Sequence, residues 1–140
     1  MILRDDEILD FIPQRPPIVM VDGLVSVDDK GVETTFNVSE DNIFCEGGVL
    51  KEPGLIEHVA QSAAVRIGYL SRESSGPVPI GLIGGVNKLK VHSLPKVGST
   101  LKTKITIDYE VLNATVISAE VRCDEQVLLT CSMKIFIAGN

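Results

Sequence analysis

The sequence predicts an α+β fold in which an antiparallel β-sheet curls around one long helix. Residues 53–70 place apolar side chains at helical spacing, whereas most of the surrounding chain alternates with the period of a strand. The clearest alternation lies in residues 126–138, which keep one apolar face at Val127, Leu129, Cys131, Met133, Ile135 and Ile137. The 140 residues are the usual size of one domain. Because we see no linker and no repeat, we expect one domain over residues 1–140.

The elements before the long helix are short. In chain order we expect a helix over about 5–12, an extended connector at 14–17, strands over 19–27 and 32–38 joined by a turn at 28–31, and an irregular loop over 39–52. Pro13 ends the first helix because proline cannot continue it. The paired prolines of the connector keep it extended.

The long helix begins with Pro53, which suits a first helical turn, and Gly54, which permits close backbone approach. Its predicted core stripe consists of Ile56, Ala60, Ala63, Ile67 and Leu70, widened by Leu55, Val59 and Ala64. Many of these residues are small, so the helix is thin enough for a sheet to wrap it.

Four longer strands follow the helix. We expect them over about 79–92, 99–110, 112–123 and 126–138, after a turn at 74–79. A curled sheet of this kind leaves an edge strand open, and pairing the edges of two subunits would close it. The sequence therefore predicts a homodimer or a higher oligomer.

Composition excludes several classes of protein. The net charge of −6 and the absence of a Lys/Arg run argue against a nucleic-acid-binding protein. The N-terminus is acidic and poor in apolar residues, so we expect no signal peptide, and no apolar run approaches the length of a membrane span. The three cysteines lack metal-ligand spacing and there are two histidines, so we expect free thiols in the cytoplasm, no metal and no cofactor.

Glu57 and Gln61 are the candidate catalytic residues. They lie at i and i+4 of the long helix and therefore on one face. Burying a carboxylate costs several kcal/mol unless it is paired. Glu57 is either a charge stabilised by the helix dipole or a catalytic acid/base close to the helix N-terminus.

Three segments resemble one enzyme family. They are IPQRPPIVMVDGLVSV at 12–27, EPGLIEHVAQSAA at 52–64 and GGVNKLKVHSLPKVGSTL at 84–101. Their motifs and order resemble those of the bacterial 3-hydroxyacyl-[acyl carrier protein] dehydratases of fatty-acid synthesis. The resemblance implies a hotdog fold and a ligand that is an acyl thioester of acyl carrier protein or coenzyme A. It also assigns Glu57 to the family's helix carboxylate and Gln61 to the glutamine four residues later.

The departures from this family fall on the chemistry. Residues 44–50 lack the family's catalytic His, Gln14 replaces the His of the opening motif, and Asn87 replaces an Asp. Glu57 would then serve as both acid and base, which predicts weak dehydration. The backbone N–H groups around Gly47, Gly48 and Gly54 are expected to bind the thioester carbonyl.

Two further residues are candidates for substrate binding. Glu46 is either a solvated turn residue or a second carboxylate that replaces the lost His. His58 either reaches a site at the dimer seam from the other subunit or belongs to the interface.

Three functions therefore stay open. The first is a dehydratase-like enzyme in fatty-acid or related acyl-chain synthesis. The second is an acyl-CoA or acyl-carrier thioesterase, which needs one carboxylate and no His. The third is a non-catalytic acyl-thioester-binding subunit. Lysines on two successive strands, Lys88 and Lys90 on one and Lys102 and Lys104 on the next, together with Arg66 and Arg72 late on the long helix, form either a basic dock for an acidic carrier protein or a solvated face.

Overall fold

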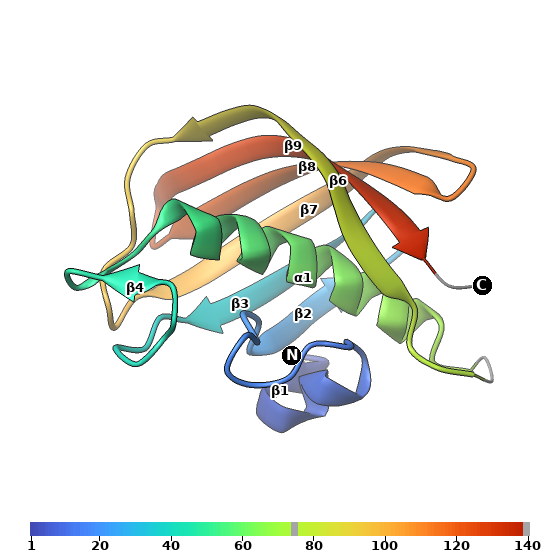
Figure 1. Cartoon of the computed structure of the whole chain (residues 1–140), viewed down its shortest axis with the longest axis horizontal. Coiled ribbons are helices and arrows are strands. Elements are labelled where there is room, and N and C mark those ends of the chain that lie inside the picture. The colour runs from blue at the N-terminus through green and yellow to red at the C-terminus, as the bar shows by residue number, and fades with distance from the viewer. Residues whose placement is uncertain (74–75, 139–140) are drawn as a thin grey trace.

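Within residues 1–73 and 76–138, which the computed structural model describes, seven strands form one antiparallel sheet that wraps around helix α1 (Figure 1). The sheet order is β1-β2-β3-β7-β8-β9-β6, and β4 pairs with β5 in a separate hairpin. The elements are β1 (Leu3–Arg4), the 3₁₀ helix η1 (Asp5–Asp10), β2 (Gly23–Val27), β3 (Gly31–Asn37), β4 (Cys45–Glu46), β5 (Val49–Leu50), α1 (Glu52–Leu70), β6 (Ile80–Val91), β7 (Thr100–Val111), β8 (Ala114–Cys123) and β9 (Gln126–Ala138). The predicted α+β architecture is therefore confirmed. Ser74 and Ser75 of the predicted turn at 74–79 lie outside the described residues.

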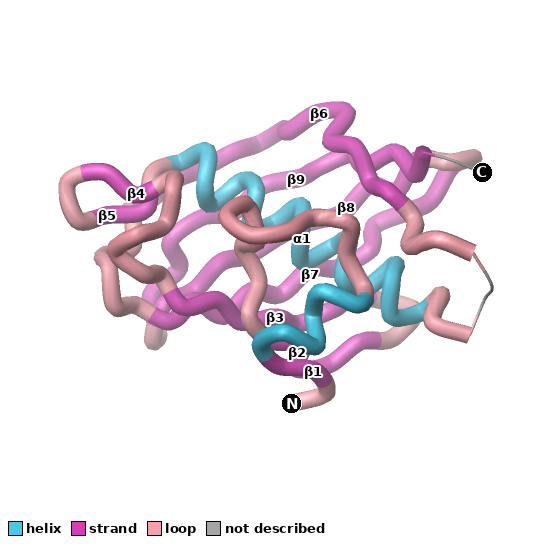
Figure 2. Tube along the Cα trace, turned by 60° about the horizontal axis from the view of Figure 1, so that its bottom comes forward, coloured by secondary structure: helices cyan, strands magenta, loops and turns pink. Residues whose placement is uncertain are grey.

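The segment before β2 differs from the prediction. The strand expected over 19–27 begins only at Gly23, and the helix expected over 5–12 is a 3₁₀ helix. The backbone of Met20 does not join the sheet, because its N–H donates to the side chain of Gln61 at 2.6 Å and its carbonyl lies 2.6 Å from a ring nitrogen of His58. Residues 11–22 consequently lie against α1, as Figure 2 shows for the loop that passes over the helix.

The loop expected over 39–52 contains the β4–β5 hairpin at one end of the molecule (Figure 2). Gly47 and Gly48 connect its strands with φ values of 63° and 81°. Positive φ at both central residues is the signature of a type I′ turn, which glycine adopts without steric strain. These two glycines therefore have a structural role in the turn.

Helix α1 buries Leu55, Val59, Ala63 and Ala64 as predicted, but the rest of the predicted stripe lies beside its buried face. Of the predicted stripe, Ala63 is buried, Ile56, Ala60 and Ile67 are partly exposed, and Leu70 is 48% exposed. The fully buried positions include Leu55, His58, Val59, Ser62 and Val65. Apolar or small residues occupy almost the whole circumference of this helix, so their periodicity does not identify the face that meets the sheet.

The second half of α1 holds the N-terminal segment and the β2–β3 turn. The buried guanidinium of Arg66 donates to the carbonyl oxygens of Asp28 and Asp29 at 3.0 and 3.1 Å. A Cβ on Gly68 would lie 1.9 Å from the carbonyl oxygen of Phe11. Glycine at this position lets the N-terminal segment pack directly on the helix backbone.

Gly68→Ala should therefore destabilise the fold. Relief of this overlap requires a backbone shift, and overpacking of this kind typically costs about 1–3 kcal/mol. Urea denaturation measures the loss. Gly85→Ala is the matched control, because nothing lies within 4 Å of a Cβ there. Equal stability of the two variants would contradict the close packing of Phe11 on the helix.

Candidate functional site

Glu57 and Gln61 form a hydrogen-bonded pair on α1. Glu57 is half-buried in the second turn of the helix, and Gln61 is fully buried one turn later. The Nε2 of Gln61 donates to Oε2 of Glu57 at 2.7 Å. The i, i+4 spacing predicts this contact. Oε1 of Glu57 has no hydrogen-bond partner among the described residues. The carboxylate is thus oriented through one oxygen while the other stays open.

The side-chain amide of Gln61 is fully used. Its Oε1 accepts the N–H of Met20 at 2.6 Å, and its Nε2 donates to the carbonyl of Ile18 at 2.8 Å as well as to Glu57. Because each polar atom has a partner of the matching kind, the amide has one favourable orientation. Gln61 therefore presents an N–H, rather than an oxygen, to the carboxylate.

His58 lies on the sheet side of the helix and is fully buried. Its Nδ1 is 2.6 Å from the carbonyl oxygen of Met20, its Nε2 is 2.7 Å from Oγ1 of Thr103, and its ring stacks on Phe36 with centroids 5.6 Å apart. Burial lowers the His58 pKa to about 4, so the ring is neutral near pH 7. Both ring nitrogens are engaged inside the subunit, which differs from the expectation that His58 reaches a substrate across a dimer seam.

The glycines and Glu46 of the expected site lie elsewhere. Gly47, Gly48 and Glu46 are exposed on the β4–β5 hairpin. The N–H of Gly54 donates to the carbonyl of Lys51 at 3.0 Å, and a Cβ there would lie 2.6 Å from atoms of Phe44 and Leu50. Close packing thus explains the glycine at 54. Among the described residues, none of these groups hydrogen-bonds to Glu57 or Gln61.

The backbone of Ile18 and Met20 and the hydroxyl of Thr103, which hydrogen-bond to Gln61 and His58, were not predicted from the sequence. The only signal was the pair of prolines at 16 and 17, which interrupts the segment before β2. The same segment holds Gln14, whose Oε1 is buried and has no hydrogen-bond partner within the described chain.

Neither a metal site nor a membrane span is found in the parts of the chain that the structure covers. Over residues 1–73 and 76–138, His, Cys, Asp and Glu do not gather in groups of three that would hold a metal ion. No helix in these ranges has the length and apolar character to cross a membrane.

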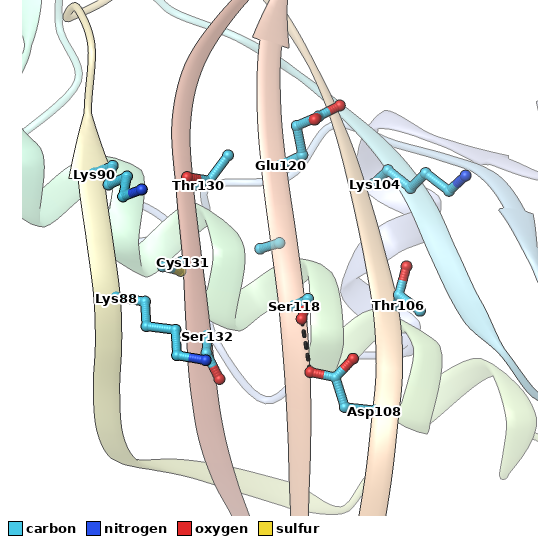
Figure 3. Close-up of a pocket in the computed structure, with 11 residues that line it drawn as sticks. Lys88, Lys90, Lys104, Thr106, Asp108, Ser118, Glu120, Thr130, Cys131 and Ser132 are labelled. Atoms are coloured by element: carbon cyan, nitrogen blue, oxygen red, sulfur yellow. Dashed lines mark hydrogen bonds between the residues drawn. The ribbon is translucent and has the colours of Figure 1, made fainter.

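A separate groove lies on the outer face of the sheet (Figure 3). It has a volume of about 570 Å³ and is lined by Lys88 and Lys90 of β6, Lys104, Thr106 and Asp108 of β7, Ser118, Ala119 and Glu120 of β8, and Thr130, Cys131 and Ser132 of β9. Lys104 is exposed, whereas the adjacent Thr103 is buried against His58. Since neighbouring residues of a strand point to opposite faces, the groove and the Glu57 pair lie on opposite sides of the sheet.

The three lysines share this groove with two carboxylates but form no ion pair in the described residues. The carboxylate of Asp108 accepts a hydrogen bond from Ser118 at 2.6 Å, and Glu120 pairs with Arg122 at 2.6 Å. Within the described ranges that pair is the single ion pair, so the groove lysines have none. Lys88 has a φ of 54° inside a bulge of β6, and a bulge redirects the side chains beside it.

Acidic and basic residues are unevenly distributed between the two halves of the chain. Residues 1–79 hold six Lys and Arg against fourteen Asp and Glu, whereas residues 80–140 hold seven against five. The acidic balance of the whole chain therefore comes from its first half, and strands β6–β9 lie in a basic half.

Comparison with known proteins identifies related sequences. Residues 6–139 match the ApeP-like family, described as ApeP dehydratase. The chain is 27% identical over 132 residues to the 3-hydroxyacyl-[acyl-carrier-protein] dehydratase FabZ of Desulfotalea psychrophila, covering 90% of this chain and 87% of that protein.

Solved structures show the same fold. The dehydratase heterocomplex ApeI:P from Xenorhabdus doucetiae contains a chain similar to this one with a TM-score of 0.89 at 20% identity, covering 100% of this chain and 94% of that one. A hypothetical thioesterase with coenzyme A from Streptococcus pneumoniae gives a TM-score of 0.65 at 14% identity, covering 84% and 85%. These likenesses confirm the hotdog fold.

The burial of His58 predicts a pH-dependent stability. In the unfolded chain the imidazole has an ordinary pKa of 6.5, against about 4 in the folded chain. The unfolded state therefore binds the proton first as the pH falls. The stability that depends on neutral His58 is complete above the unfolded value and is lost toward the folded value, by up to about 3 kcal/mol.

Urea denaturation between about pH 7 and about pH 5 measures this loss. His58→Asn, which does not titrate, should show a shallower dependence. Asp22 acts in the opposite sense, because burial raises its carboxyl pKa above the ordinary value of 3.8 and the folded state then takes up that proton first. Equal pH dependence in both proteins would contradict a buried neutral His58.

Proposed function

Because the chain belongs to the ApeP-like dehydratase family, we propose that it dehydrates a 3-hydroxyacyl thioester with Glu57 as general acid/base and Gln61 as the group that orients it. The observation that carries this proposal is the fixed donor from Gln61 to one oxygen of a half-buried carboxylate. Such an arrangement holds the carboxylate in one direction without neutralising it. The other oxygen then remains available to a substrate.

Dehydration of a 3-hydroxyacyl thioester requires two proton transfers. The base removes a proton from the α-carbon, the electron pair forms the carbon–carbon double bond, and the hydroxyl leaves as water after it is protonated. A single carboxylate performs both transfers when it takes the carbon-bound proton and returns it to the departing oxygen. Glu57 is the group proposed for both.

A second titratable group is missing from the expected place. Residues 44–50 include the β4–β5 hairpin and hold no histidine. We therefore expect slow dehydration by this chain alone, unless a partner subunit supplies an imidazole. The heterocomplex of its structural relative supports the idea of a mixed assembly.

Thioesterase activity is the second candidate. One helix carboxylate without an imidazole is sufficient for hydrolysis of a thioester by an activated water. The coenzyme A of the Streptococcus pneumoniae structure supports an acyl-thioester ligand for this fold. Mass spectrometry of the products from a panel of 3-hydroxyacyl and saturated acyl thioesters separates the two reactions.

Glu57→Gln should abolish most turnover and leave the fold intact. Loss of a general acid/base group typically costs ~10²–10⁴ in rate, and the isosteric amide keeps the size of the side chain. Steady-state kinetics on the thioester that the wild type processes measures the effect. The control is Glu52→Gln in the first helical turn, which should keep wild-type turnover. Undiminished turnover in Glu57→Gln would move the reaction to another group.

A dimer explains the exposed apolar residues around the open edge of the sheet. The edge strand β6 carries Ile80, Leu82, Ile83 and Leu89 at 46%, 54%, 42% and 41% exposure. Ile56 and Ile67 of the helix are also partly exposed, and Leu70 is 48% exposed. We therefore propose that β6 pairs with a second copy of this chain in a homodimer.

Light scattering should give the purified chain about twice its mass of 15.1 kDa. Ile83→Asp should shift the protein toward the monomer, because burying an unpaired carboxylate at the seam is costly. Leu112→Asp, at a fully exposed position, should not. A monomer at micromolar concentration in the wild type would contradict the proposal.

The outer groove fits an acidic carrier protein. Its three lysines have no described ion pair, and an acyl carrier protein presents the complementary charge. We propose that the carrier docks over Lys88 and Lys90 beside the open edge.

The free thiols Cys45, Cys123 and Cys131 support a cytoplasmic location, and the continuous core from Leu3 to Ile135 supports one domain.

Replacing Lys88 and Lys90 together by Glu should raise KM for a carrier-linked substrate by about tenfold or more. KM for the same acyl group on coenzyme A should change much less. Lys96→Glu, at an exposed lysine outside the groove, is the matched control. An equal rise of KM for both substrates would contradict docking in the groove.

A further inference from the structure

His58 is connected to Glu57 by hydrogen bonds that run through Met20 and Gln61. The imidazole is buried between α1 and the sheet, where it stacks on Phe36 and contacts Thr103 of β7. Its Nδ1 lies 2.6 Å from the carbonyl oxygen of Met20. A carbonyl oxygen only accepts, so Nδ1 carries the proton, and Nε2 of the neutral ring accepts the hydroxyl of Thr103.

Met20 links His58 to the acid/base pair. Its carbonyl is held by His58, and its N–H donates to Oε1 of Gln61 at 2.6 Å. Both groups of this residue are therefore held by side chains of the same helix. Met20 is fully buried, so water offers no replacement for either bond.

The Met20 N–H is the donor that holds the oxygen of the Gln61 amide. It requires that oxygen to face Met20, while the carbonyl of Ile18 and the carboxylate of Glu57 require the amide nitrogen to face them. A shift of Met20 would leave Oε1 of Gln61 without its donor and would weaken this orientation. A reversed amide would place an oxygen against the carboxylate, which is repulsive.

We propose that His58 is a positioning residue for the dehydration, fixing the orientation of Gln61, and through it the direction of Glu57, by holding the Met20 carbonyl with its Nδ1–H. This role rests on the proposed function of Glu57. It makes His58 neither the missing base nor a substrate ligand. The Nδ1 contact carries the effect, whereas the Nε2 contact to Thr103 anchors the ring.

Two substitutions separate the two ring nitrogens. In His58→Asn the side-chain amide nitrogen takes a place close to Nδ1 and still donates to Met20, whereas in His58→Gln the longer amide extends toward Thr103 and the donor to Met20 is lost. Both remove the aromatic stacking on Phe36, so both lower the melting temperature. His58→Gln should lower kcat by about tenfold or more with KM nearly unchanged, and His58→Asn should stay within about threefold of the wild type. Equal losses of kcat that follow the melting temperatures would overturn the proposal.

Nuclear magnetic resonance tests the same inference without activity, so an inactive wild type would refute the function of Glu57 and leave this test intact. In ¹⁵N-labelled protein the Met20 backbone amide and the Gln61 side-chain amide should shift further in His58→Gln than in His58→Asn, because both variants lose the imidazole ring and only His58→Gln also loses the donor to Met20. Equal shifts in the two variants, or unchanged signals in both, would overturn the proposal. In the wild type, which does not depend on the folding of any variant, the ring nitrogens of His58 should show the proton on Nδ1, and a proton on Nε2 would refute it.

Discussion

Met20 is bonded to helix α1 through both its N–H and its carbonyl, and much of the arrangement of the site depends on this pair of hydrogen bonds. They draw the connector before Asp22 off the sheet and onto the helix, which is why β2 begins only at Gly23. They also connect the sheet, through Thr103 and His58, to Gln61 and the carboxylate of Glu57. Buried peptide groups must be paired, so the connector and the helix side chains stabilise one another. The site is therefore an outcome of where the connector finds its hydrogen-bond partners.

The curl of the sheet determines where the Glu57 pair, the lysine-lined groove and the open edge strand lie. An inner face closed by α1 holds the Glu57 pair, and the outer face presents a groove with three lysines (Figure 3). The order of strands leaves β6 at an edge, where exposed apolar side chains lie near the partly exposed stripe of the helix. One topology thus separates three regions of different chemistry: the hydrogen-bonded pair of Glu57 and Gln61, an edge strand with exposed apolar side chains, and a lysine-lined groove in an acidic protein.

The sequence was sufficient for the long elements and insufficient for the connections between them. Alternation over β6–β9 and the helical spacing of 53–70 predicted the bounds of these elements to within two residues. Each is long enough for the period of its apolar residues to distinguish strand from helix. Val19 and Val21 alternate in the same way, yet their segment is drawn away by side chains 38 to 41 positions later, which no local pattern reveals. The contact between Glu57 and Gln61 was predictable because i, i+4 spacing is local. The position of His58 was not, because apolar or small residues lie almost all round this helix and packing decides which face meets the sheet. Gly47 and Gly48 lie in a turn, and Gly54 lies at a close contact, which local spacing does not reveal.

The proposed role of Glu57 is to move a proton to and from carbon, and the reverse reaction in deuterium oxide tests it. The wild type and Glu57→Gln are each incubated with a 2-enoyl thioester, and the masses of the products are measured by mass spectrometry after return to ordinary water. A 3-hydroxyacyl thioester that retains one deuterium on its α-carbon should be formed by the wild type and be nearly absent with Glu57→Gln. Free acid and thiol as the only products, or equal deuterium incorporation by both proteins, would refute this role.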